Sequence, residues 1–410
     1  MMDAKTQRPP FSPADILLPT GSPEKWAVIA CDQYTSEPEY WHTAEQIVGD
    51  APSALRVIFP EVYLSDPAHD AERIRQINAT MHAYLGGGVL RTLPNTMIYT
   101  CRTVTGGAVR HGLIGQIDLT DYAYQKGSRT LIRATEQTVA ERIPPRVQIR
   151  RDAPMELPHV MLLIDDPADT VFGPLAEETA ASDPLYDFDL MQHGGHLTGR
   201  ALPAAAVARV QAALSALIAG QADPLLFAVG DGNHSLAAAK ECYLADPTEE
   251  KRYALVEVVN IHDPSLVFEP IYRIMFGVQP DELIAGFIAA CGECAPDAPD
   301  AQRFTAVSGG QERTFAVRPT GKLAVGTLQT FLDRWLAAHP AASIDYIHGE
   351  ESVRRLAARE DAVGFLLAGM RKDELFAAVR QGGSLPRKTF SMGHADDKRF
   401  YLEARRLISE

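Results

Sequence analysis

The chain has 410 residues, of which 46% are hydrophobic and 22% charged, the composition of a folded globular protein rather than a disordered one. Its 53 acidic and 39 basic residues give a formal charge of −14, which disfavours nucleic acid as a partner because a phosphate backbone requires a basic face. No apolar run approaches the ~20 residues of a membrane span, and the first residues lack a secretory signal. We therefore expect a cytoplasmic protein that binds neither nucleic acid nor membrane.

Hydrophobic spacing and turn residues predict alternating helices and strands. The predicted elements are a helix over residues 70–85, a hairpin of strands 96–105 and 112–119 that turns at Gly106-Gly107, a helix over 130–142 ended by Pro144-Pro145, a strand over 160–164, a helix over 203–218, a strand over 224–229, a helix over 236–244 and a strand over 253–260. This alternation predicts a mixed α/β fold. The composition changes at about residues 280–302, which predicts a main domain over residues 1–280 and a smaller C-terminal α/β unit over residues 281–410.

One segment combines a strand, a glycine loop and a helix start, and it is the main candidate for chemistry. The apolar run that ends at Val229 is followed by Gly230-Asp231-Gly232-Asn233-His234-Ser235 and then by a good helix-forming sequence. The start of a helix presents unpaired N–H groups and a partial positive charge, so it attracts phosphate or carboxylate. Asp231 is suited to hold a metal ion, and His234 is suited to donate to a phosphoryl oxygen. The other interpretation is that the segment is only a turn.

Two further segments carry candidate groups. Arg133 and Glu136 lie one turn apart on the predicted helix, so Glu136 is either a general base or the partner of Arg133 in a surface ion pair. His193 and His196 flank a Gly-Gly pair, which suggests a ligand or zinc site, although a flexible loop explains the glycines equally well.

Two basic segments are candidates for binding an anion. Lys388 lies in a donor-rich segment near the C-terminus, and a cluster is formed by Arg142, Arg146, Arg150 and Arg151. Both segments are also compatible with charges that are simply solvated.

Together these segments resemble a large prokaryotic family, the domain of unknown function numbered one thousand and fifteen. That family carries an Asp-Gly-His-His-Arg box after a strand, an upstream His-Glu-x-Thr helix and a Pro-Pro-Lys-Ser-Thr segment near its C-terminus. The corresponding segments here are Asp231-Gly232-Asn233-His234-Ser235, Thr135-Glu136-Gln137-Thr138 and Pro386-Arg387-Lys388-Thr389. The resemblance covers nearly the whole chain.

More distantly, the box resembles the nucleotide loop of ParB and sulfiredoxin-like proteins, which include free serine kinases with Asp-Gly-His-Thr-Arg. This resemblance implies a ParB/sulfiredoxin-like core with additional strands. It also implies that Glu136 is the base and that Asp231 and His234 face the phosphates. Ser235 stands where these relatives have arginine, which removes a bidentate phosphate clamp.

The leading hypothesis is a metal-assisted phosphotransferase, a small-molecule kinase, that acts on a small hydroxylated metabolite such as free serine. The donor would be ATP, ADP or pyrophosphate, with Mg²⁺ held by Asp231. The catalytic residues would be Glu136, Asp231 and His234, and phosphate or substrate would be bound by Gly230, Gly232, Asn233, Ser235, Arg133, His193, His196 and Lys388. The alternatives are a phosphohydrolase that uses the same site and a non-catalytic sensor that binds nucleotide or phosphate.

Overall fold

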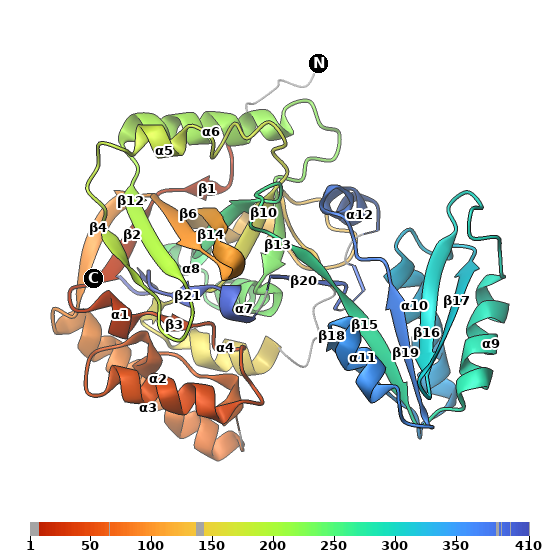
Figure 1. The fold of residues 1–410 in the computed structure, drawn as a ribbon. Helices are drawn as coiled ribbons and strands as arrows, with labels where there is room; N and C mark the ends of the chain where they lie inside the picture. Colours follow the sequence, from red (N-terminus) through yellow and green to blue (C-terminus); the bar gives the residue numbers. More distant parts are fainter. Residues whose placement is uncertain are drawn as a thin grey trace. The chain divides into compact units, whose positions relative to one another are not determined.

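The computed structural model describes residues 8–64, 66–136, 143–382, 385–386, 388–393 and 395–409 (Figure 1). Helices and strands alternate along these ranges, which confirms the mixed α/β class. No helix within them is both long enough and apolar enough to cross a bilayer. Four residues singled out from the sequence, Gln137, Thr138, Arg142 and Arg387, lie outside the described residues.

The chain divides into two compact units whose limits differ from those predicted. The first unit is Met1–Leu266 together with Gly393–Glu410, and the second is Val267–Met392. The predicted boundary after residue 280 would remove strand β15 (Phe268–Phe276) from the second unit, where it pairs with β18 and β19. The last residues return to the first unit because β21 and β22 pair there with β3 and β9.

The first unit contains one large sheet and several short strand pairs. Its strands are β1 (Phe11–Ser12), β2 (Ala14–Pro19), β3 (Val28–Ile29), β4 (Leu90–Thr96), β5 (Ile98–Thr103), β6 (Val109–Asp118), β7 (Tyr122–Ala123), β8 (Ile132–Ala134), β9 (Met155–Glu156), β10 (Met161–Ile164), β11 (Tyr186–Asp189), β12 (His196–Ala201), β13 (Phe227–Asp231), β14 (Tyr253–Asn260), β21 (Phe400–Tyr401) and β22 (Arg405–Arg406). Its helices are α1 (Pro23–Trp26), α2 (Pro38–Val48), α3 (Pro67–Gly86), α4 (Ile143–Arg151), α5 (Leu175–Glu178), α6 (Ala204–Ile218), α7 (Asn233–Ala245) and α8 (Glu249–Arg252).

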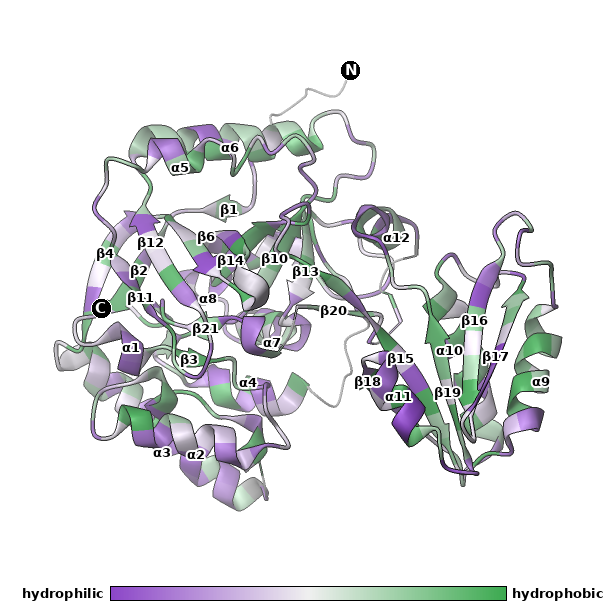
Figure 2. Cartoon of the chain, viewed as in Figure 1, coloured by the Kyte–Doolittle hydropathy of each residue, from purple (hydrophilic) through white to green (hydrophobic). Residues whose placement is uncertain are grey.

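The large sheet runs in the order β11-β12-β5-β6-β14-β10-β13-β8-β7, and β1 pairs with β6. Strand β10 is parallel to β14 on one side and antiparallel to β13 on the other. All four residues of β10 are hydrophobic and buried, as expected for a strand that is covered on both faces (Figure 2). The end of β13 is therefore held beside a rigid, buried strand.

The predicted hairpin and several predicted helices are confirmed. Strands β5 and β6 pair antiparallel from Ile98 opposite Ile114 to Thr103 opposite Val109. The turn between them uses Gly106 and Gly107, both with φ of 83°, a conformation that glycine reaches without steric strain. The helices predicted over 70–85, 203–218 and 236–244 correspond to α3, α6 and α7.

The helix predicted over residues 130–142 is wrong in its described part. Residues Ile132–Ala134 form strand β8, which pairs parallel with β13. Pro144 and Pro145 lie in the first turn of α4 instead of ending a helix, because the N–H groups of a first turn have no intrahelical partner and proline is tolerated there. A buried strand of three residues is too short to show alternation, so the helical spacing around it was misleading.

The second unit is a smaller α/β unit. Its strands are β15, β16 (Gln302–Ser308), β17 (Gln311–Val317), β18 (Ser343–His348), β19 (Ala362–Leu367) and β20 (Phe390–Met392). Its helices are α9 (Pro280–Cys291), α10 (Ala324–Ala338), α11 (Glu350–Leu356) and α12 (Leu375–Gly382). The sheet order is β17-β16-β19-β15-β18, and β20 extends the pairing of β15.

A buried glutamate helps to fix the C-terminal tail on the first unit. Glu156 in β9 accepts hydrogen bonds at 2.9 Å from both Arg405 Nε and the amide of Leu255, and it forms an ion pair with Arg150. Burial by itself would raise the pKa of Glu156, but Arg150 and Arg405 together bring the pKa below its ordinary value.

Acid is therefore expected to destabilise the first unit. Because the folded-state pKa of Glu156 is below the value of about 4.3 for an unfolded glutamate, its stabilising contribution is complete above that pH and is lost as the pH falls through the folded-state pKa. Urea unfolding should give a lower free energy at about pH 3.5 than at about pH 5. Glu156→Gln should reduce this drop more than Glu177→Gln, an exposed control. Equal drops in the two variants would contradict the assignment.

Candidate functional site

The loop after β13 has the predicted strand-loop-helix geometry. Strand β13 ends at Asp231, Gly232 is the N-cap residue, and α7 begins at Asn233. Gly232 has φ of 78°, and a Cβ at this position would lie 3.0 Å from the Cα of Val160, so the tight approach requires glycine. No side chain caps this end of α7 in the described residues, and the N–H groups at the start of a helix are suited to bind an anion.

A lysine from the C-terminal tail lies beside this loop. Lys398 Nζ is 3.2 Å from Asp231 Oδ2, and Asp231 Oδ1 accepts a hydrogen bond of 2.9 Å from the amide of Gly232. The two side chains are partly buried, with 15% of Lys398 and 27% of Asp231 exposed. The ammonium group of Lys398 therefore lies next to the N-terminus of α7.

The segment that precedes Glu136 is bonded to the same loop. The amide of Thr135 donates to Asn233 Oδ1 over 3.2 Å, and Thr135 Oγ1 donates to the carbonyl oxygen of Val229 over 2.6 Å. The parallel pairing of β8 with β13 sets this arrangement. Glu136 directly follows Thr135, the residue that contacts the loop. It comes shortly after strand β8 and does not lie on the predicted helix.

A histidine lies on the Ser235 side of the loop. His159 Nε2 is 3.3 Å from Ser235 Oγ and 3.7 Å from Asp32 Oδ2, while His159 Nδ1 is 2.6 Å from the hydroxyl of Tyr401. Tyr401 donates its hydroxyl hydrogen to Cys31 Sγ over 3.1 Å. With that donation, Nδ1 carries a hydrogen toward Tyr401, and Nε2 faces Ser235 and Asp32.

Cationic groups surround Asp32, close to the loop. Burial by itself would raise the pKa of Asp32, but His159, Arg146 and Lys398 bring the pKa below its ordinary value. Asp32 is therefore a carboxylate at neutral pH. Lys398, which pairs with Asp231, therefore also acts electrostatically on Asp32.

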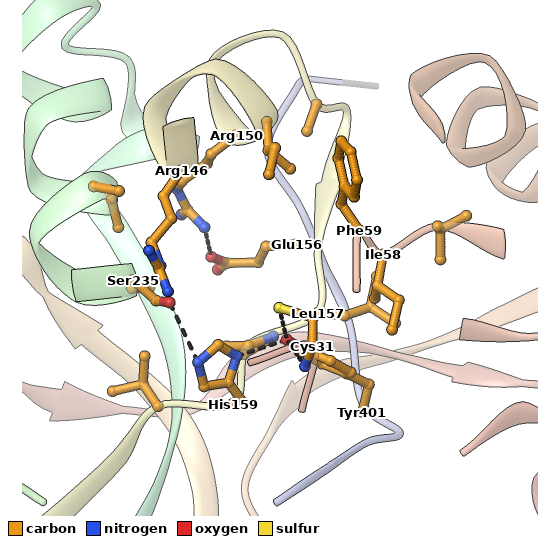
Figure 3. A pocket seen from close by; sticks show the side chains of 18 of the residues that line it. Cys31, Ile58, Phe59, Arg146, Arg150, Glu156, Leu157, His159, Ser235 and Tyr401 are labelled. Carbon is orange, nitrogen blue, oxygen red and sulfur yellow. Dashed lines mark hydrogen bonds and ion pairs between the residues drawn. The ribbon is translucent and has the colours of Figure 1, made fainter. Parts of the chain in front are cut away.

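A cavity of about 150 Å³ opens beside the loop, within the first unit. Ser235 and His159 belong both to the loop region and to the cavity lining. Figure 3 draws Ser235, His159, Cys31 and Tyr401 along one side of the cavity and Arg146, Arg150 and Glu156 along another. Most of the other lining side chains are aliphatic or aromatic. The loop and the cavity together form the candidate site.

The sequence matches the family described as "Protein of unknown function (DUF1015)" over residues 14–339. The chain belongs to this family. A search of curated proteins finds no match.

Solved structures show a distant likeness to this DUF1015 member. A free serine kinase mutant in complex with AMP is 13% identical to this chain, with a TM-score of 0.41. The matched region covers 71% of this chain and 91% of the kinase chain. A conserved hypothetical protein from Pyrococcus furiosus is 13% identical to this chain, with a TM-score of 0.38. The matched region covers 68% of this chain and 89% of the Pyrococcus chain.

The structure separates several of the predicted site residues from the loop. Arg133 is buried in β8 and binds the carboxylate of Asp223 at 2.5 and 3.2 Å, so its guanidinium has a structural partner. His196 in β12 bonds to Asp187 and Asp189, at 2.6 and 2.7 Å. Four strands lie between β12 and β13 in the sheet order, so the topology does not group His193 and His196 with the loop. Lys388 belongs to the second unit, and its role stays a prediction.

The described residues do not fit a metal ion held by the protein alone. They contain no group of three or more His, Cys, Asp or Glu side chains placed to coordinate one. Asp231, the predicted magnesium ligand, already has Lys398 as a counter-charge. A cation at Asp231 would share this carboxylate with the ammonium group.

Sequence reasoning missed Asp32, His159, Lys398 and Tyr401. His159 stands alone between Pro158 and Val160 with no motif around it, and Tyr401 lies 242 residues further along the chain. Lys398 lies in the charged run Asp396-Asp397-Lys398-Arg399, which was the one available signal. Arg146 was noted as part of a basic cluster.

Proposed function

We propose that this chain is a phosphotransferase that moves a phosphoryl group to a small hydroxylated metabolite. One observation carries the proposal: the start of α7 lacks a side-chain cap in the described residues, and Lys398 lies next to it at the Asp231 carboxylate. Phosphoryl transfer depends mainly on positioning and charge neutralisation, and a helix N-terminus beside an ammonium group supplies both.

Each group at the loop has a role in this proposal. The amides at the start of α7, together with His234, would bind phosphoryl oxygens, and Lys398 would neutralise the charge that develops on the leaving group. Asp231 would orient Lys398, and Glu136 would take the proton of the acceptor hydroxyl. We assign charge neutralisation to Lys398 and no step to magnesium, because Asp231 is already paired.

The donor is expected to be compact. Ser235 supplies no guanidinium, so the loop lacks a bidentate clamp at that position, while Arg146 is among the residues that line the adjoining cavity. We therefore expect pyrophosphate to serve at least as well as ATP or ADP. Free serine is the reference acceptor because the loop resembles the Asp-Gly-His-Thr-Arg box of free serine kinases.

A phosphorus NMR screen tests the proposal directly. Purified protein is incubated with magnesium and with ATP, ADP or pyrophosphate, each alone and with a panel of alcohols that includes serine. A new phosphate ester that requires the acceptor is the expected result. Release of inorganic phosphate alone would replace the proposal with a phosphohydrolase, and binding without turnover would replace it with a sensor.

Lys398→Met is expected to lower the rate of transfer by about two to three orders of magnitude, the usual loss on removal of one transition-state donor. Lys251→Met is the matched control, because Lys251 is also 15% exposed and also pairs with an aspartate, Asp246, at 2.6 Å. The rates are measured at saturating donor and acceptor. Similar rates in the two variants would remove Lys398 from the proposed machinery.

A further inference from the structure

The cavity beside the loop has room for one small ring or a short branched chain. Its volume is about 150 Å³, and its walls include Ile58, Phe59, Met81, Leu157 and Leu236. An engineered protein cavity of about 150 Å³ lined by similar side chains stays free of water and binds benzene. An apolar body of that size is therefore the part of a ligand that these walls favour.

The charged residues of the lining are balanced in pairs. Arg146 forms an ion pair with Glu61, and Arg150 forms one with Glu156. Each pair joins one cation to one anion, so these four residues give the cavity no net charge. An ionised ligand would bury a charge without a dedicated counter-charge, which is unfavourable.

One wall carries a small polar group that suits a hydroxyl. His159 is 5% exposed, and its Nε2 meets Ser235 Oγ at 3.3 Å, longer than the most common hydrogen bonds between nitrogen and oxygen. His159 Nδ1 and Cys31 are engaged by Tyr401. A hydroxyl group, which can both donate and accept, would therefore complete this wall with one hydrogen bond to Nε2.

We propose that the cavity binds a small neutral molecule with an apolar body and one hydroxyl group, an alcohol or a phenol. The apolar body lies against the walls from residues 57–59, α3 and α7, and the hydroxyl forms a hydrogen bond with His159 Nε2. This inference concerns binding alone and does not depend on phosphoryl transfer. Ser235 belongs to the same wall, so the ligand lies next to the loop.

The test uses benzyl alcohol as the probe, with toluene and benzoate as comparators, in calorimetric titrations of the full chain without any phosphoryl donor. Benzyl alcohol should bind about threefold to tenfold more tightly than toluene, the worth of one net hydrogen bond. Benzoate should bind more weakly than either. Benzoate binding as tight as that of benzyl alcohol would overturn the inference.

Two variants, Ala239→Leu and His159→Phe, and one control, Ala206→Leu, locate the ligand. Ala239→Leu fills part of the cavity from α7 and should weaken the binding of benzyl alcohol at least tenfold, whereas Ala206→Leu, at a buried alanine of α6 that does not line the cavity, should leave binding unchanged. His159→Phe should abolish the preference for benzyl alcohol over toluene. Equal binding to the two leucine variants would place the ligand elsewhere. Displacement of benzyl alcohol by adenosine would reassign the cavity to a nucleobase and overturn the inference.

Discussion

Glu136→Gln is expected to lower the rate of phosphoryl transfer by about two to four orders of magnitude, the usual worth of a general base. Glutamine keeps the size of the side chain and its capacity for hydrogen bonds, but it cannot take a proton. The backbone that leads to Glu136 is fixed to the loop through Thr135, whose amide bonds to Asn233. A base at this position would therefore be held close to the phosphoryl site.

The measurement is the steady-state rate with the donor and acceptor that the phosphorus NMR screen identifies. Glu177→Gln, an exposed glutamate in α5, is the control for the loss of one negative charge in the first unit. Donor binding should be retained in Glu136→Gln, which separates a loss of chemistry from a loss of affinity. An unchanged rate would remove Glu136 as the base, and a large fall in melting temperature would assign it a structural role.

The local parts of the fold could be predicted from the sequence because their signals are local. Glycines at 106 and 107 mark the hairpin turn, and the apolar run that enters Gly230 marks a strand that leads into a helix. The helix predicted over the segment that contains β8 was wrong for the opposite reason. Its strand is three residues long, and it is defined by pairing with β7 and β13, which sequence spacing cannot show.

The candidate site was predicted in part, and the missing part comes from distant segments. The loop and Glu136 belong to motifs with recognisable spacing. Lys398 and Tyr401 reach the loop only because the C-terminal tail leaves the second unit and pairs with β3 and β9. A charged run gives no indication of which lysine meets which aspartate, since contacts of this range depend on the complete topology.

The tail that carries Lys398 is fixed by a buried ionic network. Arg399 Nη1 is 2.8 Å from Glu257 Oε2 in β14, and Arg399 Nη2 is 2.6 Å from Glu403 Oε2. These three side chains are between 2% and 7% exposed. Gly112 on the neighbouring strand leaves room for the Glu257 carboxylate, since a Cβ there would lie 2.3 Å from Glu257 Oε1.

Arg399→Met is expected to destabilise the first unit by about 3 to 5 kcal/mol, because it removes the guanidinium that is bonded to two buried carboxylates. Arg252→Met is the control: Arg252 also meets two carboxylates, those of Asp118 and Glu249, but it is 39% exposed, and such pairs contribute about 0 to 1 kcal/mol. Urea unfolding at neutral pH measures both variants. Adding Glu403→Gln to Arg399→Met should recover part of the loss, since it removes a buried carboxylate that has lost its guanidinium partner. If the arginine variants lose equal stability, or if the second substitution deepens the loss, the network does not hold the tail, and the position of Lys398 must depend on other contacts.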